Sequence, residues 1–330
     1  MCAQRILFIP KEYIIHHTPQ AYIIGGRAPR DRNLVSYIQQ KELIPMIDLN
    51  IAKTELHLGL LAPVRLLQIT DAHISRAYPR EMDDPQKFAH RKAAFDGDLP
   101  NGAEKRFEAL LAYAKANSLL PVFTGDIWDY MSEANFEYWD LITSGLDHIY
   151  CAGNHDFCTW PGADKEDHAY KLSALPRVLP HVKDHPVFSS RIINGVNLVC
   201  IDDGYYLFTP AQLDSLIKEV EKGLPIVLFM HVPLFAPAYA DLLLHKNPAC
   251  AYLTAPTEDY LKTYQPFRAA QQRPDDITCR MVDYIKSQPL IKAVFAGHIH
   301  DHHEHALTPT LPQFVTASAY HAAAREIVIR

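Results

Sequence analysis

Residues 64–73 read VRLLQITDAH, a mostly apolar run that ends in an aspartate and a histidine. An apolar run of this length without polar alternation is typical of a strand buried on both faces. Asp71 and His73 would then follow directly after the end of that strand. In open α/β sheets ligands bind outside the carboxyl ends of the strands, so this stretch predicts both an α/β fold and the position of a site.

Four further apolar runs end in the same way, on residue types that bind metal ions. Their terminal blocks are Gly125-Asp126, Gly153-Asn154-His155-Asp156, His231 and Gly297-His298-Ile299-His300. The glycines would let the backbone turn sharply and approach an ion closely. A single histidine is more often a surface or core residue than a ligand. Five such blocks, each at a strand end, instead predict one shared pocket.

Helical stretches separate the apolar runs. Residues 103–117 and 132–144 are amphipathic, and a helix near 210–222 has clear end signals. Thr209 and Gln212 have the spacing of a capping box, and Gly223 follows the last turn. Strands that alternate with helices predict layered α/β packing.

The residue types in the five blocks suit two adjacent divalent ions. They divide into two sets: Asp71, His73 and His300 for one ion, and Asn154, His231 and His298 for the other. Asp126 has two carboxylate oxygens and can bridge the ions. Because no thiolate is among these ligands, we expect Mn, Fe, Zn, Ni or Co in place of a structural zinc.

Two such ions favour hydrolysis of a phosphate ester. Their charge of +4, less three for Asp71, Asp126 and a bridging hydroxide, leaves about +1 to attract a phosphate. Such a pair promotes in-line attack by the hydroxide. His155 is next to a ligand but is not needed as one, so we predict that it protonates the leaving group. Asp156 is predicted to orient His155 or an adjacent ligand.

The pattern D-x-H, G-D, G-N-H-D, H and G-H-x-H resembles the calcineurin-like metallophosphoesterases, over roughly residues 64–330. The resemblance implies a four-layer α/β/β/α sandwich with two mixed β-sheets, closed by a strand near Ile327–Ile329. It also implies metal-dependent hydrolysis of a phosphoester or phosphoanhydride. The chain is most similar to the class III cyclic-nucleotide phosphodiesterase-like branch, although phosphatases, nucleases and nucleotide pyrophosphatases share the blocks.

The chain departs from this pattern at residues 1–63 and at an insert at about 232–277. Residues 1–63 predict an appended β-rich element before a catalytic domain at 64–330. Long connections at 76–102 and 232–277 are rich in proline, charge and aromatics, and such loops are usually lids or binding loops. Arg91, in the first connection, is predicted to be solvated, with a phosphate contact as the alternative.

Composition excludes several classes of protein. The net charge of −6, from 38 acidic and 32 basic residues, argues against strong non-specific binding of nucleic acid. It allows a small phosphorylated substrate, for example a nucleotide. We expect no membrane span, signal peptide or disulfide scaffold, and therefore a cytoplasmic protein.

The leading hypothesis is a dinuclear phosphoesterase that acts on a small phosphodiester or phosphomonoester. A nucleotide or lipid-linked pyrophosphatase is the alternative within enzymes. A binding scaffold that has kept the fold and lost catalysis is the alternative outside them, and the complete ligand set argues against it.

Overall fold

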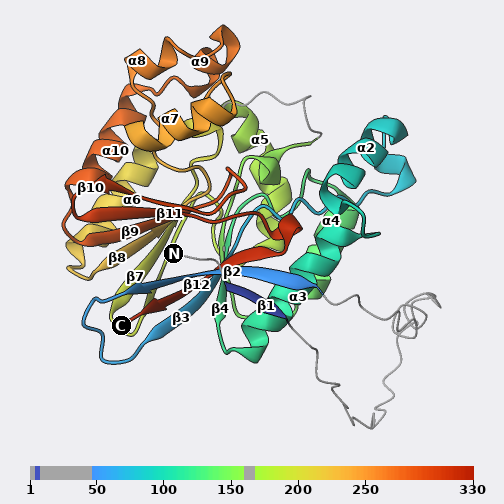
Figure 1. Ribbon diagram of the computed structural model, residues 1–330, viewed down its shortest axis with the longest axis horizontal. Helices are drawn as coiled ribbons and strands as arrows, with labels where there is room; N and C mark the ends of the chain where they lie inside the picture. The colour runs from blue at the N-terminus through green and yellow to red at the C-terminus, as the bar shows by residue number, and fades with distance from the viewer. Residues whose placement is uncertain (1–3, 8–46, 160–167) are drawn as a thin grey trace.

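The computed structural model describes residues 4–7, 47–159 and 168–330. In this part of the chain two six-stranded sheets face each other (Figure 1). The first sheet has the order β1-β2-β12-β3-β4-β5. Its strands are β1 (Gln4–Leu7), β2 (Asp48–Leu56), β12 (Ala323–Ile329), β3 (Val64–Ile69), β4 (Leu120–Thr124) and β5 (Ile149–Cys151). β3, β4 and β5 run parallel, whereas β12 runs antiparallel to β3, so the sheet is mixed.

The second sheet has the order β10-β11-β9-β8-β7-β6. Its strands are β10 (His303–Thr308), β11 (Leu311–Val315), β9 (Ile291–Ala296), β8 (Ile226–Phe229), β7 (Val196–Ile201) and β6 (Phe188–Ile193). The four central strands are parallel, and both edge strands pair antiparallel. This sheet is therefore mixed as well.

The two sheets bury apolar side chains on both of their faces. In β3, Leu66 belongs to the cluster between the sheets, and the next residue, Leu67, belongs to the cluster under the outer helices. In β8, Val227 and Leu228 divide in the same way between the inner and outer clusters. Since successive side chains of a strand point to opposite faces, this arrangement explains the continuous apolar runs of the sequence.

Helices cover the outer face of each sheet. α3 (Gly102–Ala116) and α4 (Glu133–Ile142) pack on the first sheet, and α6 (Pro210–Glu221) and α10 (Asp276–Ser287) pack on the second. Figure 1 shows these two pairs of helices on opposite sides of the sheets. The predicted four-layer α/β/β/α sandwich with two mixed sheets is confirmed.

The predicted elements lie close to those observed. Helices were expected at 103–117 and 132–144, and the structure has α3 at Gly102–Ala116 and α4 at Glu133–Ile142. The capping box of α6 is present, because Thr209 Oγ1 accepts a hydrogen bond from Gln212 N while Gln212 Oε1 accepts one from Thr209 N. The closing strand is longer than expected and begins at Ala323.

Part of the predicted N-terminal element can be located. β2 lies between β1 and β12, and it pairs with β12 in parallel from Asn50↔Ala323 to Leu56↔Ile329. Residues 48–56 therefore complete the first sheet beside the closing strand. The remaining residues of that element include 1–3 and 8–46, which lie outside the described part of the chain. The boundary near residue 63 stays a prediction.

The long connections contain helices. Residues 76–102 form η1 (Pro79–Glu81) and α2 (Pro85–Asp96), and residues 232–277 contain α7 (Pro237–Lys246), α8 (Glu258–Leu261) and α9 (Pro266–Gln272). The other elements are η2 (His155–Phe157), α5 (His168–Val178), η3 (Leu179–His181), η4 (Gly204–Tyr206) and η5 (Ala319–His321). Among the described residues, no helix is long and apolar enough to cross a membrane.

Candidate metal centre

The five predicted blocks follow β3, β4, β5, β8 and β9, and their loops meet at one site. Five of the predicted ligands have a left-handed backbone: Asp71 (φ 53°), His73 (φ 46°), Asp126 (φ 52°), His298 (φ 66°) and His300 (φ 59°). Residues other than glycine rarely adopt this conformation, and it persists where the surroundings impose it, commonly at functional sites.

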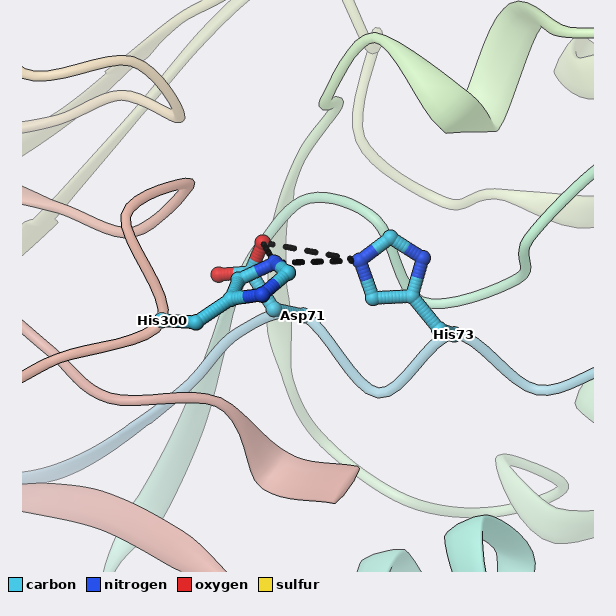
Figure 2. A group of neighbouring side chains, drawn as sticks. All are labelled: Asp71, His73 and His300. Carbon is cyan, nitrogen blue, oxygen red and sulfur yellow. Dashed lines mark hydrogen bonds and ion pairs between the residues drawn. The ribbon is translucent and has the colours of Figure 1, made fainter. Parts of the chain in front are cut away.

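Asp71, His73 and His300 form the first cluster of ligating atoms (Figure 2). Asp71 Oδ1 lies 3.1 Å from His300 Nε2 and 3.8 Å from His73 Nε2. The two imidazole Nε2 atoms are 3.3 Å apart. A carboxylate oxygen and two ring nitrogens that converge on one point can hold a divalent cation.

Asp126, His231 and His298 form a second cluster beside the first. Asp126 Oδ2 lies 3.1 Å from His231 Nε2, which is 3.2 Å from His298 Nδ1. The two clusters approach each other closely, since Asp126 Oδ2 is also 3.7 Å from His73 Nε2, and Asp71 Oδ1 is 3.9 Å from His231 Nε2. Asp126 therefore lies between the two sets of imidazoles.

Two buried oxygens at this site accept no hydrogen bond from the described residues. They are Asp71 Oδ1 and Asn154 Oδ1. An unsatisfied buried oxygen costs free energy unless a cation or water occupies its lone pairs. Both belong to the predicted ligand set, so the donors present fit bound metal.

Two glycines allow these loops to pack closely. A Cβ on Gly153 would lie 2.3 Å from Asp126 Oδ1 and 2.9 Å from His231 Cγ. A Cβ on Gly297 would lie 2.0 Å from Thr70 Oγ1 and 2.6 Å from Asp71 Oδ2. Any side chain at either position would push a predicted ligand out of place.

Each of the four cluster imidazoles has its second ring nitrogen held by a fixed group. His231 Nδ1 lies 2.8 Å from Thr124 O, and His73 Nδ1 lies 3.1 Å from Asp129 Oδ1. His298 Nε2 lies 3.1 Å from the Tyr206 hydroxyl, and His300 Nδ1 lies 2.9 Å from the Tyr320 hydroxyl. Such outer contacts set the tautomer and orientation of metal-binding histidines. Neither tyrosine was among the predicted ligands or catalytic residues.

Asp129 is the main site residue to which the sequence assigned no role. Its buried carboxylate faces two histidines, with Oδ1 3.1 Å from His73 Nδ1 and 3.2 Å from His155 Nδ1. Arg91 donates to the same carboxylate, with Nε 2.9 Å from Oδ2. Arg91 was predicted to be solvated, with a phosphate contact as the alternative. In the structure it contacts Asp129 instead. The available signal was the position of Asp129, three residues after Asp126 on one loop.

The described hydrogen bonds of the Asp156 carboxylate come from backbone amides and not from an imidazole. Its carboxylate accepts hydrogen bonds from Gly153 N at 2.8 Å, Asp126 N at 3.0 Å and Ile127 N at 3.0 Å. The His155 ring is instead oriented by Asp129, through its backbone carbonyl at 2.9 Å as well as its carboxylate. Asp156 thus fixes the loop that carries Asp126.

In the metal-free site, the shifted pKa values favour a negatively charged Asp126 beside a positively charged His231. Burial raises the pKa of Asp126, but the adjacent His231 and His155 outweigh burial and hold it well below its usual range. Burial lowers the pKa of His231, yet Asp126 and Asp71 raise it to about 10. Burial and the His231 charge lower the pKa of His298 to about 3. A bound cation would take the place of the proton on His231.

A cavity of about 510 Å³ opens from these clusters. It is lined by His73, Asp126, His155, His298 and His300. The lining also includes six residues of α7 and the segment after it, which we call the α7 wall: Leu243, Lys246, Asn247, Cys250, Ala251 and Tyr252. The 232–277 insert thus forms part of the same cavity as the strand-end loops.

The sandwich and its buried cluster of carboxylates and imidazoles define a metal-dependent hydrolase of phosphoric esters. Residues 64–302 match the sequence model of the calcineurin-like phosphoesterases, and the chain belongs to that family. No curated protein matches the chain in sequence.

Several solved structures are similar to this chain at low sequence identity. A dimetal phosphatase from Danio rerio has 11% identity and a TM-score of 0.45, over 79% of this chain and 91% of that one. The phosphopantetheinyl hydrolase of Mycobacterium tuberculosis has 13% identity and a TM-score of 0.38, over 79% and 92%. A 5'-nucleotidase from Candida albicans has 12% identity and a TM-score of 0.38, over 78% and 46%.

Proposed function

We propose that this site binds two divalent ions and hydrolyses a small phosphomonoester or phosphodiester. The observation that carries the proposal is the pair of adjacent clusters, each with three ligating atoms within 4.8 Å of one another. Single-metal sites need only one such cluster. The absence of thiolates from both clusters favours Mn, Fe, Zn, Ni or Co.

The proposed ligands follow the two clusters. Asp71, His73 and His300 would hold one ion, His231, His298 and Asn154 the other, and Asp126 lies where it can serve both. When bound, the two ions would supply the positive charge that attracts the phosphate and activates the attacking water. The unsatisfied oxygens of Asp71 and Asn154 support this assignment.

We propose His155 as the residue that protonates the leaving group. Its Nδ1 edge contacts Asp129, which leaves Nε2 as the nitrogen available to a substrate, and the side chain lines the cavity. The Asp129 carboxylate stabilises the protonated ring and holds it in one orientation. His155 also lies near His73 and Asp126, so metal analysis of a His155 variant distinguishes a proton donor from a ligand.

Metal content and activity test the proposal together. The protein is stripped with a chelator, reloaded with Mn²⁺, Zn²⁺, Ni²⁺ or Co²⁺, and analysed by plasma mass spectrometry. We expect two ions per chain and hydrolysis of p-nitrophenyl phosphate or its bis ester. Full activity with one ion per chain would contradict the dinuclear centre. A fully loaded protein that cleaves no ester would contradict the reaction.

The choice of substrate needs a broader screen of the loaded protein. Cleavage of 3',5'-cyclic nucleotides would support the class III phosphodiesterase-like branch. Cleavage of nucleoside diphosphate conjugates between the two phosphates would support the pyrophosphatase alternative. We favour simple esters over pyrophosphates because Lys246, the one lysine or arginine among the described lining residues, is already paired with Asp301 and so offers little to a second phosphate.

A further inference from the structure

The cavity is larger than the phosphate group needs. Its volume of about 510 Å³ lies in the usual range for small-molecule sites, roughly 300–1,000 Å³. Under the proposed function the phosphate occupies the end formed by the two clusters. The rest of the space, up to the α7 wall, lies where the organic part of an ester would extend.

The part of the cavity lined by the α7 wall is mostly apolar. Leu243, Cys250 and Ala251 are each less than a tenth exposed, and they share a hydrophobic cluster with Ile299, which also lines the cavity. The Tyr252 ring centroid is 6.2 Å from that of His298. The Tyr252 ring therefore brings apolar surface beside a proposed metal ligand.

The charge beside the α7 wall is balanced. Among the lining residues that the structure describes, Lys246 is the one lysine or arginine. Its Nζ lies 2.8 Å from Asp301 Oδ2, and Asp301 lines the same cavity. A second phosphate or a carboxylate in this part of the cavity would meet an already paired cation, so an uncharged group fits better.

The α7 wall is held in place by several contacts. Tyr252 has a left-handed backbone (φ 53°), and the Arg268 guanidinium lies 5.1 Å from its ring centroid. The segment is also tied to the metal site, because Thr254 Oγ1 donates to Asp203 Oδ2 at 2.9 Å. Asp203 Oδ1 in turn accepts from the backbone N–H of His231 at 3.1 Å. A wall fixed relative to the ligands can discriminate between substrates by shape.

We propose that the α7 wall binds the organic group of the substrate, and that this group is compact, uncharged and largely apolar. The inference rests on the proposed function for the position of the phosphate. It names a part of the substrate that the strand-end blocks leave undetermined.

Alkyl phosphates with similar alkoxide leaving groups provide the test. For the metal-loaded protein, we expect kcat/KM for benzyl phosphate to exceed that for methyl phosphate by about tenfold or more. We expect 4-carboxybenzyl phosphate to lose most of that advantage, because its charge finds no free partner. Tyr252→Ala should lower kcat/KM for benzyl phosphate more than for methyl phosphate.

A second substitution adds bulk at an exposed residue of the α7 wall. Asn247→Trp should fill part of the cavity and reduce the preference for the larger ester. Matched controls lie on the same insert outside the cavity lining: Phe267→Ala for the aromatic deletion and Leu242→Trp for the added bulk. Both control side chains are exposed, at 71% and 41%, and both variants should keep the wild-type ratio.

Direct binding separates this inference from the proposed function. Calorimetric titration of the loaded protein with benzylphosphonate and methylphosphonate should show tighter binding of the benzyl compound, weakened in Tyr252→Ala. Hydrolysis of both esters at equal kcat/KM, with equal phosphonate affinities, would overturn the inference and leave the proposed function standing. Preferential binding of benzylphosphonate without hydrolysis of any ester would support the inference and overturn the proposed function. If neither phosphonate binds, both fail.

Discussion

The strand-end loops and the α7 wall enclose one cavity, but they are built in different ways. The loops carry buried carboxylates and imidazoles on a left-handed backbone, and they fix one another through hydrogen bonds such as His298 N to Asp71 Oδ2 at 2.9 Å. The α7 wall packs around its own hydrophobic cluster and carries its charges at the surface. This difference suggests that the loops provide the chemistry and the wall provides the selection.

The largest effect is expected from the residue between the two clusters. Asp126→Ala should remove both ions and lower kcat by at least about 1,000-fold, since metal charge stabilises the transition state by several kcal/mol. Metal analysis and steady-state kinetics on one preparation provide the measurement. The exposed Asp259→Ala serves as the control. Retention of both ions with wild-type activity would show that Asp126 does not belong to the centre.

His155→Ala separates metal binding from proton transfer within the loops. We expect two ions per chain and a loss in kcat of about 100-fold or more, because a positioned general acid commonly contributes that much. The loss should be larger for methyl phosphate than for p-nitrophenyl phosphate, whose leaving group needs no proton. Loss of an ion in this variant would identify His155 as a ligand instead.

The pH dependence of the metal-free site gives a moderate effect. The pKa of His231 is raised from its usual 6.5 to about 10, so its pairing with Asp126 stabilises the unloaded protein fully below pH 6.5. That contribution is lost as the pH rises toward 10. Because an ion must displace this proton, apparent metal affinity should rise between pH 6.5 and 8.5.

Thermal unfolding with and without Mn²⁺ measures this effect. Across pH 6.5, 7.5 and 8.5, the Tm of the chelator-treated protein should fall while the increase in Tm on adding metal grows. A constant difference in Tm over the three values would contradict the proposed proton displacement at His231.

The smallest effect is expected where the two regions join. Thr254→Val deletes the hydrogen bond from the insert to Asp203 and should reduce the free energy of unfolding by about 1 kcal/mol. Metal content should not change, whereas the preference for benzyl over methyl phosphate should weaken as the wall loosens. Thr263→Val, at an exposed position of the same insert, is the matched control. An unchanged preference would show that the wall does not depend on this contact.

The site could be predicted from the sequence as far as local patterns reach. Buried parallel strands leave continuous apolar runs, so the ends of β3, β4, β5, β8 and β9 were visible within one or two residues. The polar block after each run then gave the residues that meet in the two clusters. The role of each residue in them stays a proposal.

Contacts between distant segments were not predictable in this way. Arg91 and Asp129 are 38 residues apart, and nothing in either stretch shows that they pair. The same holds for Tyr206 with His298, and for the α7 wall with the loops.

The sequence alone therefore determined where along the chain the strands that carry the site lie and which residue types follow them, because both are set by residues that are close together in the sequence. Tertiary structure decided that β2 pairs with β12, that Asp129 holds His73 and His155, and that the α7 wall faces the metal clusters. Those outcomes depend on how sheets, helices and loops pack, and packing between segments far apart in sequence leaves no periodic signal in either one.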